Sequence, residues 1–293
     1  MTYSIVARDP ATSQLGVAVQ SHWFSVGSLV TWARPGVGAV ATQANGRAEY
    51  GPRGLELMAG GMSAADALAT ALGEDDGGRA RQVALVSAAG EVACWTGPDC
   101  MAFAGDMQSD EVSCQANLMR SETVWGAMLE AFMWESGPLA RRLYAALLAG
   151  EEAGGDIRGR QSAALLVVPA SGQWWETDVS LRVEDSPDPL GELGRLLRLH
   201  DAYQAAGAAD GAVARGSFDE AADGYRRAAE LAPESQELRF WGALGQAHAG
   251  DDEAAVAQLR QLFAENPDWR VLLERLKPAT APAAERLLGL LGG

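Results

Sequence analysis

The chain has 293 residues, of which 48% are hydrophobic, and a formal net charge of −16. This length predicts about two domains, and the acidic balance excludes a nucleic-acid partner because phosphate binding needs a basic face. No run approaches the roughly 20 apolar residues of a membrane helix. Three cysteines without histidines at ligand spacing favour a reducing cytoplasm and indicate neither a metal site nor a cofactor.

The first elements in the chain are two predicted β-hairpins. Residues 3–8 and 14–21 are rich in β-branched residues and flank the turn sequence DPATS. Residues 28–33 and 36–43 form a second pair of strands across ARPG. Because strands joined by short turns pair antiparallel, we expect mainly antiparallel sheets.

Helices and hairpins then alternate as far as residue 186. The expected helices start near Tyr50 and cover 64–72, 122–135 and 138–149, and the expected strands cover 82–88, 91–96, 162–168 and 173–183, with short strands in 101–118. Two helical pairs are available to cover the outer faces of two packed sheets. The pattern predicts an α+β fold, a four-layer αββα sandwich, over residues 1–186.

The remainder of the chain, residues 187–293, is almost wholly helical in pattern. Similar residues recur there at a spacing of 34, such as Gly216 with Gly250 and Pro233 with Pro267. This period resembles the tetratricopeptide repeat, in which neighbouring helices bury each other's faces. We therefore expect a small all-helical domain with a surface available to a protein partner.

Thr2 is the first candidate for chemistry. In N-terminal-nucleophile (Ntn) hydrolases, the hydroxyl of the first residue attacks and its own α-amine, with a pKa near ~8, is the base. A threonine after Met1 is small enough for removal of the methionine to be expected. The competing interpretation is that Thr2 merely opens a strand.

Several separated motifs resemble one bacterial family over about residues 2–185. They are TYSIVARDPATSQLGVAVQSHWFSVGS, GVGAVATQ, YGPRGLELMAGGMSAADAL, RQVALVSAAGEV, TGPDC and GGDIRGRQSAALLVV. The resemblance is to DUF1028, a family of unknown function assigned to the Ntn-hydrolase-like proteins. It implies the αββα fold and a relation to proteasome β-type subunits, but no substrate.

The likeness of the first hairpin to the proteasome-type start implies candidate catalytic residues. Thr2 falls on the nucleophile, Ser21 near the position of an acidic residue and Arg34 roughly at that of a lysine. An arginine does not exchange protons, so Arg34 would act electrostatically. Asp156 and Ser162 fall at a junction that carries an Asp and a Ser near the nucleophile; the alternative there is a loop shaped by an ion pair.

Polar loop residues complete the candidate site, because loops at strand ends often line pockets. Asn117 is a candidate donor to an oxyanion, and arginines can bind a substrate carboxylate. The candidates for substrate binding are Asn45, Arg47, Arg53 and Gln161. For each of these residues, a purely structural role is the alternative.

These observations predict an amidohydrolase of the Ntn type that acts on an amide or related C–N bond of a small molecule. The alternative is a non-catalytic module that binds a ligand or assembles with a partner protein. We expect a cytoplasmic homo-oligomer such as a homodimer, without a nucleic-acid or membrane partner.

Overall fold

The computed structural model describes residues 2–278 and 281–292. The chain divides into two compact units, Met1–Gly194 and Arg195–Gly293. The division lies a few residues beyond the boundary expected at residue 186.

Two antiparallel sheets form the core of the first unit. Six strands in the order β10-β9-β2-β1-β8-β7 make one sheet, and four in the order β3-β4-β5-β6 make the other, within the described residues. The strands are β1 (Thr2–Arg8), β2 (Leu15–Ser21), β3 (Thr31–Arg34), β4 (Gly38–Ala44), β5 (Arg81–Ser87), β6 (Val92–Thr96), β7 (Gly105–Ser109), β8 (Val112–Asn117), β9 (Ser162–Val168) and β10 (Val179–Val183).

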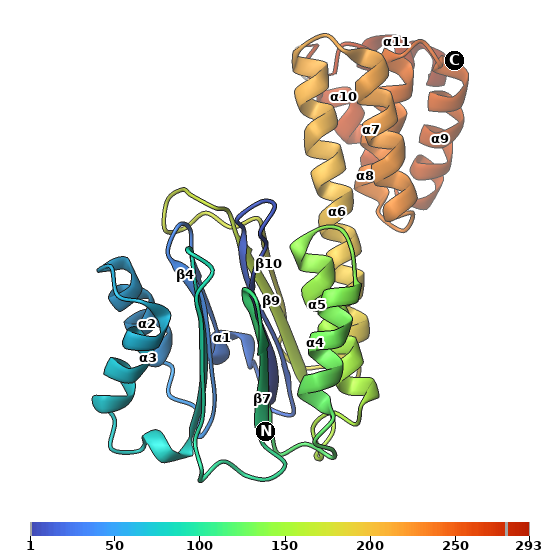
Figure 1. Ribbon diagram of the computed structural model, residues 1–293. Helices are drawn as coiled ribbons and strands as arrows, with labels where there is room; N and C mark the ends of the chain where they lie inside the picture. The colour runs from blue at the N-terminus through green and yellow to red at the C-terminus, as the bar shows by residue number, and fades with distance from the viewer. Residues whose placement is uncertain (1, 279–280, 293) are drawn as a thin grey trace. The chain divides into compact units, whose positions relative to one another are not determined.

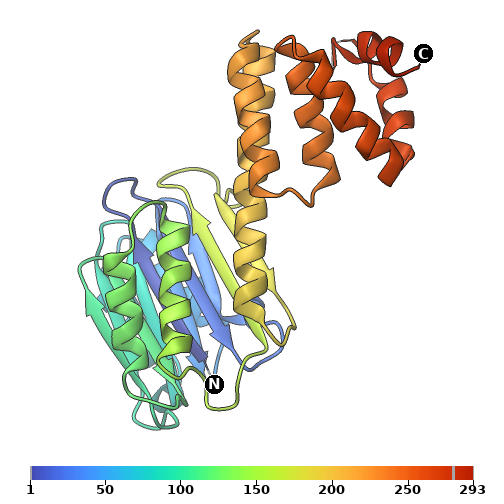
Figure 2. The ribbon, with the colours of Figure 1, turned by 90° about the vertical axis from the view of Figure 1, so that its right-hand side faces the viewer.

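A pair of helices covers the outer face of each sheet (Figures 1 and 2). Helices α4 (Val124–Trp134) and α5 (Leu139–Glu152) pack on the six-stranded sheet, while α2 (Tyr50–Ala59) and α3 (Ala64–Gly73) pack on the four-stranded sheet. The inner faces of the two sheets contact each other through β1 with β4 and β5 with β8. The layers therefore run helix, sheet, sheet, helix.

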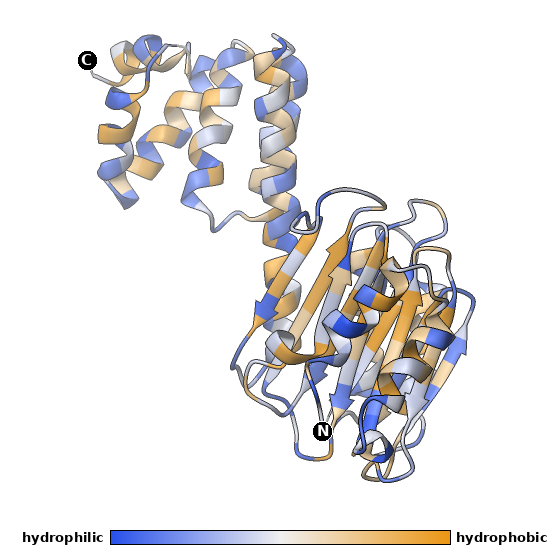
Figure 3. Cartoon of the chain, turned by 90° about the vertical axis from the view of Figure 1, so that its left-hand side faces the viewer, coloured by the Kyte–Doolittle hydropathy of each residue, from blue (hydrophilic) through white to orange (hydrophobic). Residues whose placement is uncertain are grey.

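Successive side chains of β1 point to opposite faces of the sheet, so the strand contributes to the core between the sheets and to the core beneath the helices. Val6, on the face between the sheets, clusters with Val17 of β2 and with Ala39 and Ala84 of the opposite sheet. Tyr3 points the other way, where its hydroxyl donates to Glu151 of α5 over 2.9 Å. Since both faces of the strands are covered, the strands are hydrophobic along much of their length (Figure 3).

Two predicted strands differ from the observed ones at their ends. Residues 28–30, expected to be extended, belong to the short helix α1 (Gly27–Val30). The strand expected over 173–183 begins only at Val179, and Trp174 and Trp175 lie before it with 72% and 60% of their surface exposed. The apolar residues of these two segments are typical of strands, but in the structure both segments lie outside the paired strands.

The second unit is all helical, as predicted. Helix α9 begins and ends 34 residues after α7, and the glycines that precede them, Gly216 and Gly250, both have positive φ angles of 75° and 91°. No described helix is long and apolar enough to cross a membrane. Its described helices are α6 (Pro189–Ala214), whose first residues belong to the first unit, α7 (Phe218–Leu231), α8 (Gln236–His248), α9 (Asp252–Glu265), α10 (Asp268–Arg275) and α11 (Ala284–Leu291).

Candidate functional site

A pocket of about 540 Å³ opens beside the start of β1. This volume lies within the range of small-molecule sites, roughly 300–1,000 Å³. We call it the Thr2 pocket; its lining residues are Thr2, Ser21, Trp23, Val26, Leu29, Val30, Thr42, Gln43, Ala44, Asn45, Gly46, Ala48, Ala80, Asp99, Met101 and Arg158.

Thr2 lies where β1 meets its two neighbouring strands. It pairs with Ser21 of β2 and with Asn117 of β8. Its Oγ1 lies 3.0 Å from the Ser21 Oγ, so either hydroxyl can donate to the other. Because Thr2 and Val6 are an even number of residues apart on one strand, both face the interior between the sheets. The strand geometry thus places the Thr2 hydroxyl, only 6% of the residue being exposed, at the pocket.

Asp156 lies just beyond the start of β1. Its Oδ2 accepts from the backbone N–H of His22, the residue after Ser21, over 3.2 Å, and its backbone bridges to Met119, two residues after Asn117. Since β1 runs between β2 and β8, these contacts place the carboxylate at the open end of the strand that Thr2 begins.

The same carboxylate is held in its charged form. Burial acts to raise the pKa of Asp156, but the pKa is lowered overall, and hydrogen bonds from the side chain and the backbone N–H of Arg158 are the largest of the effects that lower it. The Arg158 Nη2 donates to the Asp156 Oδ2 over 2.7 Å. Asp156 is therefore a buried anion whose charge is balanced by a guanidinium that also lines the Thr2 pocket.

Three buried amide side chains, those of Gln43, Gln82 and Asn117, form a hydrogen-bonded network next to Thr2. The Gln82 Oε1 accepts from both the Gln43 Nε2 and the Asn117 Nδ2, each over 2.8 Å. The Gln43 and Asn117 amides also approach the Thr2 carbonyl oxygen at 3.3 and 3.5 Å. The Asn117 amide therefore lies beside Thr2 and contacts its carbonyl oxygen, and its role as a donor to an oxyanion stays a prediction.

Ser162 shapes the apolar wall of the pocket. Its Oγ donates to the carbonyl of Trp23 and accepts from the N–H of Val26 over 3.0 Å, and the residue pairs with Ser21 in the sheet. The expected proximity of Ser162 to Thr2 is therefore indirect. It fixes the backbone that carries Trp23 and Val26 into the pocket.

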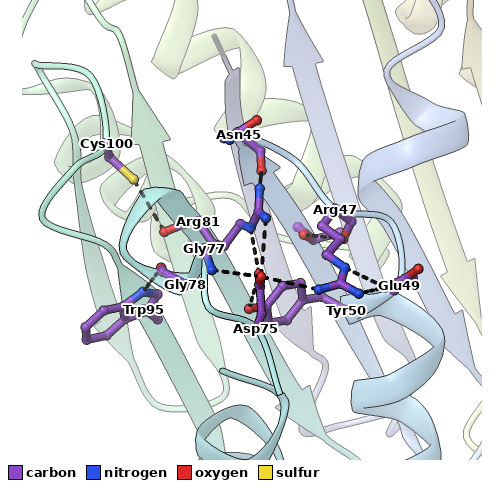
Figure 4. Close-up of polar contacts among 11 residues, drawn as sticks. Asn45, Arg47, Glu49, Tyr50, Asp75, Gly77, Gly78, Arg81, Trp95 and Cys100 are labelled. Carbon is purple, nitrogen blue, oxygen red and sulfur yellow. Dashed lines mark hydrogen bonds and ion pairs between the residues drawn. The ribbon is translucent and has the colours of Figure 1, made fainter. Parts of the chain in front are cut away.

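A second polar network is centred on Asp75 and contacts the loop of residues 45–49, which forms another wall of the Thr2 pocket (Figure 4). Asp75 accepts from the Arg81 Nε over 2.8 Å and the Tyr50 hydroxyl over 3.0 Å, and pairs with Arg47 at 3.3 Å. The hydrogen bonds from Arg81 and Tyr50 lower the pKa of Asp75, with Arg81 the main cause, whereas burial raises the pKa of Tyr50 to about 12. Arg81 also donates to the Asn45 carbonyl, so the network anchors the loop that lines the pocket.

Comparison with known proteins agrees with this architecture. The model of a family of unknown function, DUF1028, matches residues 2–193. The chain belongs to the DUF1028 family. A crystal structure of protein SPO2555 from Silicibacter pomeroyi, a DUF1028 protein, is similar at 31% identity with a TM-score of 0.61, covering 67% of this chain and 88% of that one. No relative was found among curated proteins.

Besides Asn117, Asp156 and Ser162, four further expected site residues of the DUF1028 domain are not part of the lining of the Thr2 pocket. Arg34 pairs with Gly38, at the opposite end of β4 from Gln43, and is exposed. Arg53 binds Glu74, and with Arg47 it lines a separate hollow of about 160 Å³. The remaining residue, Gln161, donates to Asp185 over 3.0 Å. The sequence position of Arg34 did not reveal which end of the sheet it would occupy, whereas Gln161 lies at the Thr2 end, where its backbone N–H donates to the Ser21 carbonyl, but its side chain bonds elsewhere.

Sequence reasoning missed the glutamines of this DUF1028 domain. Gln43 and Gln82 are each at most 2% exposed, and each stands in a mainly apolar strand. A polar amide in an apolar strand was the available signal, because buried polar groups require partners. Within residues 2–278 and 281–292, no cluster of His, Cys, Asp and Glu is placed to hold a metal ion.

Proposed function

We propose that the DUF1028 domain is an Ntn-type αββα hydrolase that cleaves an amide or related C–N bond of a small molecule, with Thr2 as the nucleophile after removal of Met1. The observation that carries this proposal is the Thr2 hydroxyl at a pocket of about 540 Å³, with the Asp156 carboxylate at the end of its strand. The two sheets, each covered by a helical pair, are consistent with that fold type.

The proposed reaction proceeds in two steps. The Thr2 Oγ1 attacks the amide carbonyl while the α-amine of Thr2 takes up the hydroxyl proton and then passes it to the leaving amine. Water, deprotonated by the same amine, hydrolyses the resulting ester and regenerates Thr2. Ser21, whose Oγ is 3.0 Å from Thr2 Oγ1, orients the attacking oxygen.

Asp156 has a positioning part in this proposal. Its position beyond β1 is where a newly exposed α-amine of Thr2 would emerge, and a lowered pKa keeps the carboxylate anionic near neutral pH. An anion there attracts the amine and fixes its direction. Arg158 limits this attraction, so that the amine is not locked in its protonated form.

Turnover of a panel of acyl para-nitroanilides tests the proposal. Thr2→Ala is expected to lower hydrolysis at least about a thousandfold, as loss of a nucleophile does, while Thr2→Ser retains part of it. Thr12→Ala, the same change at an exposed residue of the β1–β2 turn, is the matched control and leaves turnover unchanged. Equal turnover by the Thr2→Ala and Thr12→Ala variants would refute the mechanism.

A second variant tests the α-amine itself. Inserting a lysine between Met1 and Thr2 prevents methionine removal, so the Thr2 nitrogen stays in a peptide bond and cannot act as a base. We expect this chain to fold and to bind ligand but to lose turnover. Full activity of the inserted chain would exclude the amine as the base.

Ligand binding without catalysis is the second candidate. Both charged side chains of the described pocket lining are engaged in ion pairs, Asp99 with Arg79 and Arg158 with Asp156. No charged lining group is thus left unpaired to transfer protons. Saturable binding of an amide with no product from the chain lacking Met1 would favour this function over hydrolysis.

For the helical unit we propose a tetratricopeptide-like repeat that binds a protein partner. The 34-residue offset of α7 and α9 supports it, as does a groove of about 380 Å³ between α7 and α8 that includes Ala229, Pro233 and Gly242. Gly242→Arg would fill this groove. A partner that binds wild type and the Gly242→Arg variant equally well would argue against the groove as its site.

A further inference from the structure

The Thr2 pocket presents mainly apolar side chains to a ligand. One wall consists of residues from the end of β2 to the end of α1, namely Trp23, Val26, Leu29 and Val30, and Met101 adds a further apolar contact. Trp23, Leu29 and Met101 are 58%, 43% and 44% exposed. Exposed large apolar residues that line a pocket indicate a ligand-binding surface.

The polar groups of the lining are largely occupied. The Thr42 hydroxyl donates to the Arg47 carbonyl over 3.1 Å, and the hydroxyls of Thr2 and Ser21 bond to each other. Asp99 and Arg158, the charged residues of the described lining, are both in ion pairs. A charged group entering this pocket would lose its hydration without gaining a free counter-charge, which is costly.

The acyl part of the substrate is the part that must fit here. During the proposed reaction the amine leaves, whereas the acyl group remains bonded to the Thr2 Oγ1 until water releases it. A group attached to that oxygen must occupy the space that Thr2 lines. The composition of the pocket therefore determines the acyl group and constrains the amine much less.

We propose that the Thr2 pocket selects amides with an uncharged, apolar acyl group, which packs against Val26, Leu29 and Val30. This inference rests on the proposed hydrolase function and adds the class of substrate. The exposed position of Leu29 on α1 makes it a specificity-determining residue that can be changed without disturbing the buried core.

Three para-nitroanilides with acyl chains of similar length test the inference. They carry a hexanoyl group, a glutaryl group with a terminal carboxylate, and an aminopentanoyl group with a terminal ammonium. Binding is measured by calorimetry on the full-length Thr2→Ala chain, which binds without cleaving. We expect the hexanoyl compound to bind at least about tenfold more tightly than either charged one, because burying a charge costs more than burying methylenes.

A matched pair of leucine variants locates the effect. Leu29→Glu, in the Thr2→Ala background, is expected to weaken hexanoyl binding at least about tenfold, since it places a carboxylate on the apolar wall. Leu148→Glu changes a leucine of similar exposure, 37%, on α5 and outside the pocket lining, and leaves binding unchanged.

The outcomes separate this inference from the proposed function. Equal binding of the charged and apolar compounds, no saturable binding of the hexanoyl compound, or equal effects of the two leucine variants would overturn the inference. Tight and selective binding of the hexanoyl compound that the wild-type chain does not cleave would support the inference and contradict hydrolysis.

Discussion

Gln82 links the two sheets through side-chain hydrogen bonds next to Thr2. It lies in β5 of the four-stranded sheet, fully buried, and accepts from Asn117 of β8 in the six-stranded sheet. Its Nε2 donates to the Thr96 hydroxyl and the Ala116 carbonyl, each over 2.9 Å. One side chain thus sets the spacing of the sheets at the strand end that carries Thr2.

Replacing this glutamine should cost stability. Gln82→Leu keeps a similar volume but leaves a buried amide of Gln43 without its closest acceptor, so we expect the free energy of unfolding to fall by about 2 kcal/mol. Gln108→Leu, an exposed glutamine on β7, should change it by less than about 0.5 kcal/mol. Urea unfolding measures both, and equal midpoints would show that the network does not stabilise the fold.

The residues of the site were only partly predictable. Thr2, Ser21 and Asn45 line one pocket, because the first hairpin fixes the Thr2–Ser21 pair and Asn45 follows a strand of the facing sheet. Arg34 instead lies at the other end of β4 from Gln43, because a sequence position next to a turn does not say which end of the sheet that turn reaches. That requires the order and direction of strands, which depend on long-range pairing.

At the level of elements, the loop between β4 and α2 depends on a residue far along the chain. Asp75, just after α3, pairs with Arg47 within this loop and with Arg81, which donates to the Asn45 carbonyl. Binding residues often lie on loops that a rigid scaffold positions. The wall formed by Asn45 and Gly46 should therefore respond to changes at Asp75.

Asp75→Asn is expected to loosen that wall. The neutral amide retains the shape but loses the charge that attracts Arg47 and Arg81, so we expect faster hydrogen exchange of residues 45–49 and a loss of about 2 kcal/mol in unfolding free energy. The adjacent, exposed Asp76→Asn is the control. Identical exchange in the two variants would mean that Asp75 does not hold the loop.

The stability difference between wild type and Asp75→Asn should depend on pH. The folded-state pKa of Asp75 lies below its ordinary value, mainly because Arg81 donates to it, so its contribution is fully present above the ordinary pKa near ~4. It is lost as pH falls below that value, because the unfolded chain then binds the proton that the folded chain excludes. Urea unfolding of both proteins from pH 7 down to pH 3 checks this, and a constant difference would contradict it.

Element positions were predictable where local signals agreed. The hairpin 82–88 with 91–96 is β5 and β6 within a residue or so, because two short, continuous apolar runs flank a tight turn. The segment before Val179 carries two adjacent tryptophans, which favour a strand locally, yet neighbouring strand β9 pairs only with residues 179–183. Pairing across the sheet, rather than local propensity, determined where that strand begins.

For the whole molecule, division into two compact units predicts that changes in one leave the other's function intact. Gly245 of α8 lies close to Tyr225 of α7, where an added Cβ would stand 2.5 Å from the ring. Gly245→Ala should destabilise the helical unit by about 1–3 kcal/mol, whereas Gly207→Ala, with open space around it on α6, should stabilise it by roughly 0.5–1 kcal/mol.

Thermal unfolding followed by circular dichroism, together with calorimetric binding of the hexanoyl compound, checks this independence. We expect opposite shifts of the helical transition in the two glycine variants and unchanged binding at the Thr2 pocket. Weaker ligand binding by the Gly245→Ala variant alone would show that the two units are coupled.

Covalent labelling of the intact protein tests the central claim most directly. An alkyne-bearing β-lactone acylates a nucleophilic threonine hydroxyl, and mass spectrometry of the whole chain and its peptides locates the adduct. Our account predicts a chain without Met1 that carries one label on Thr2, and no label in Thr2→Ala. A chain that keeps Met1 and is unlabelled at Thr2, or equal labelling of the Thr2→Ala variant, would contradict it.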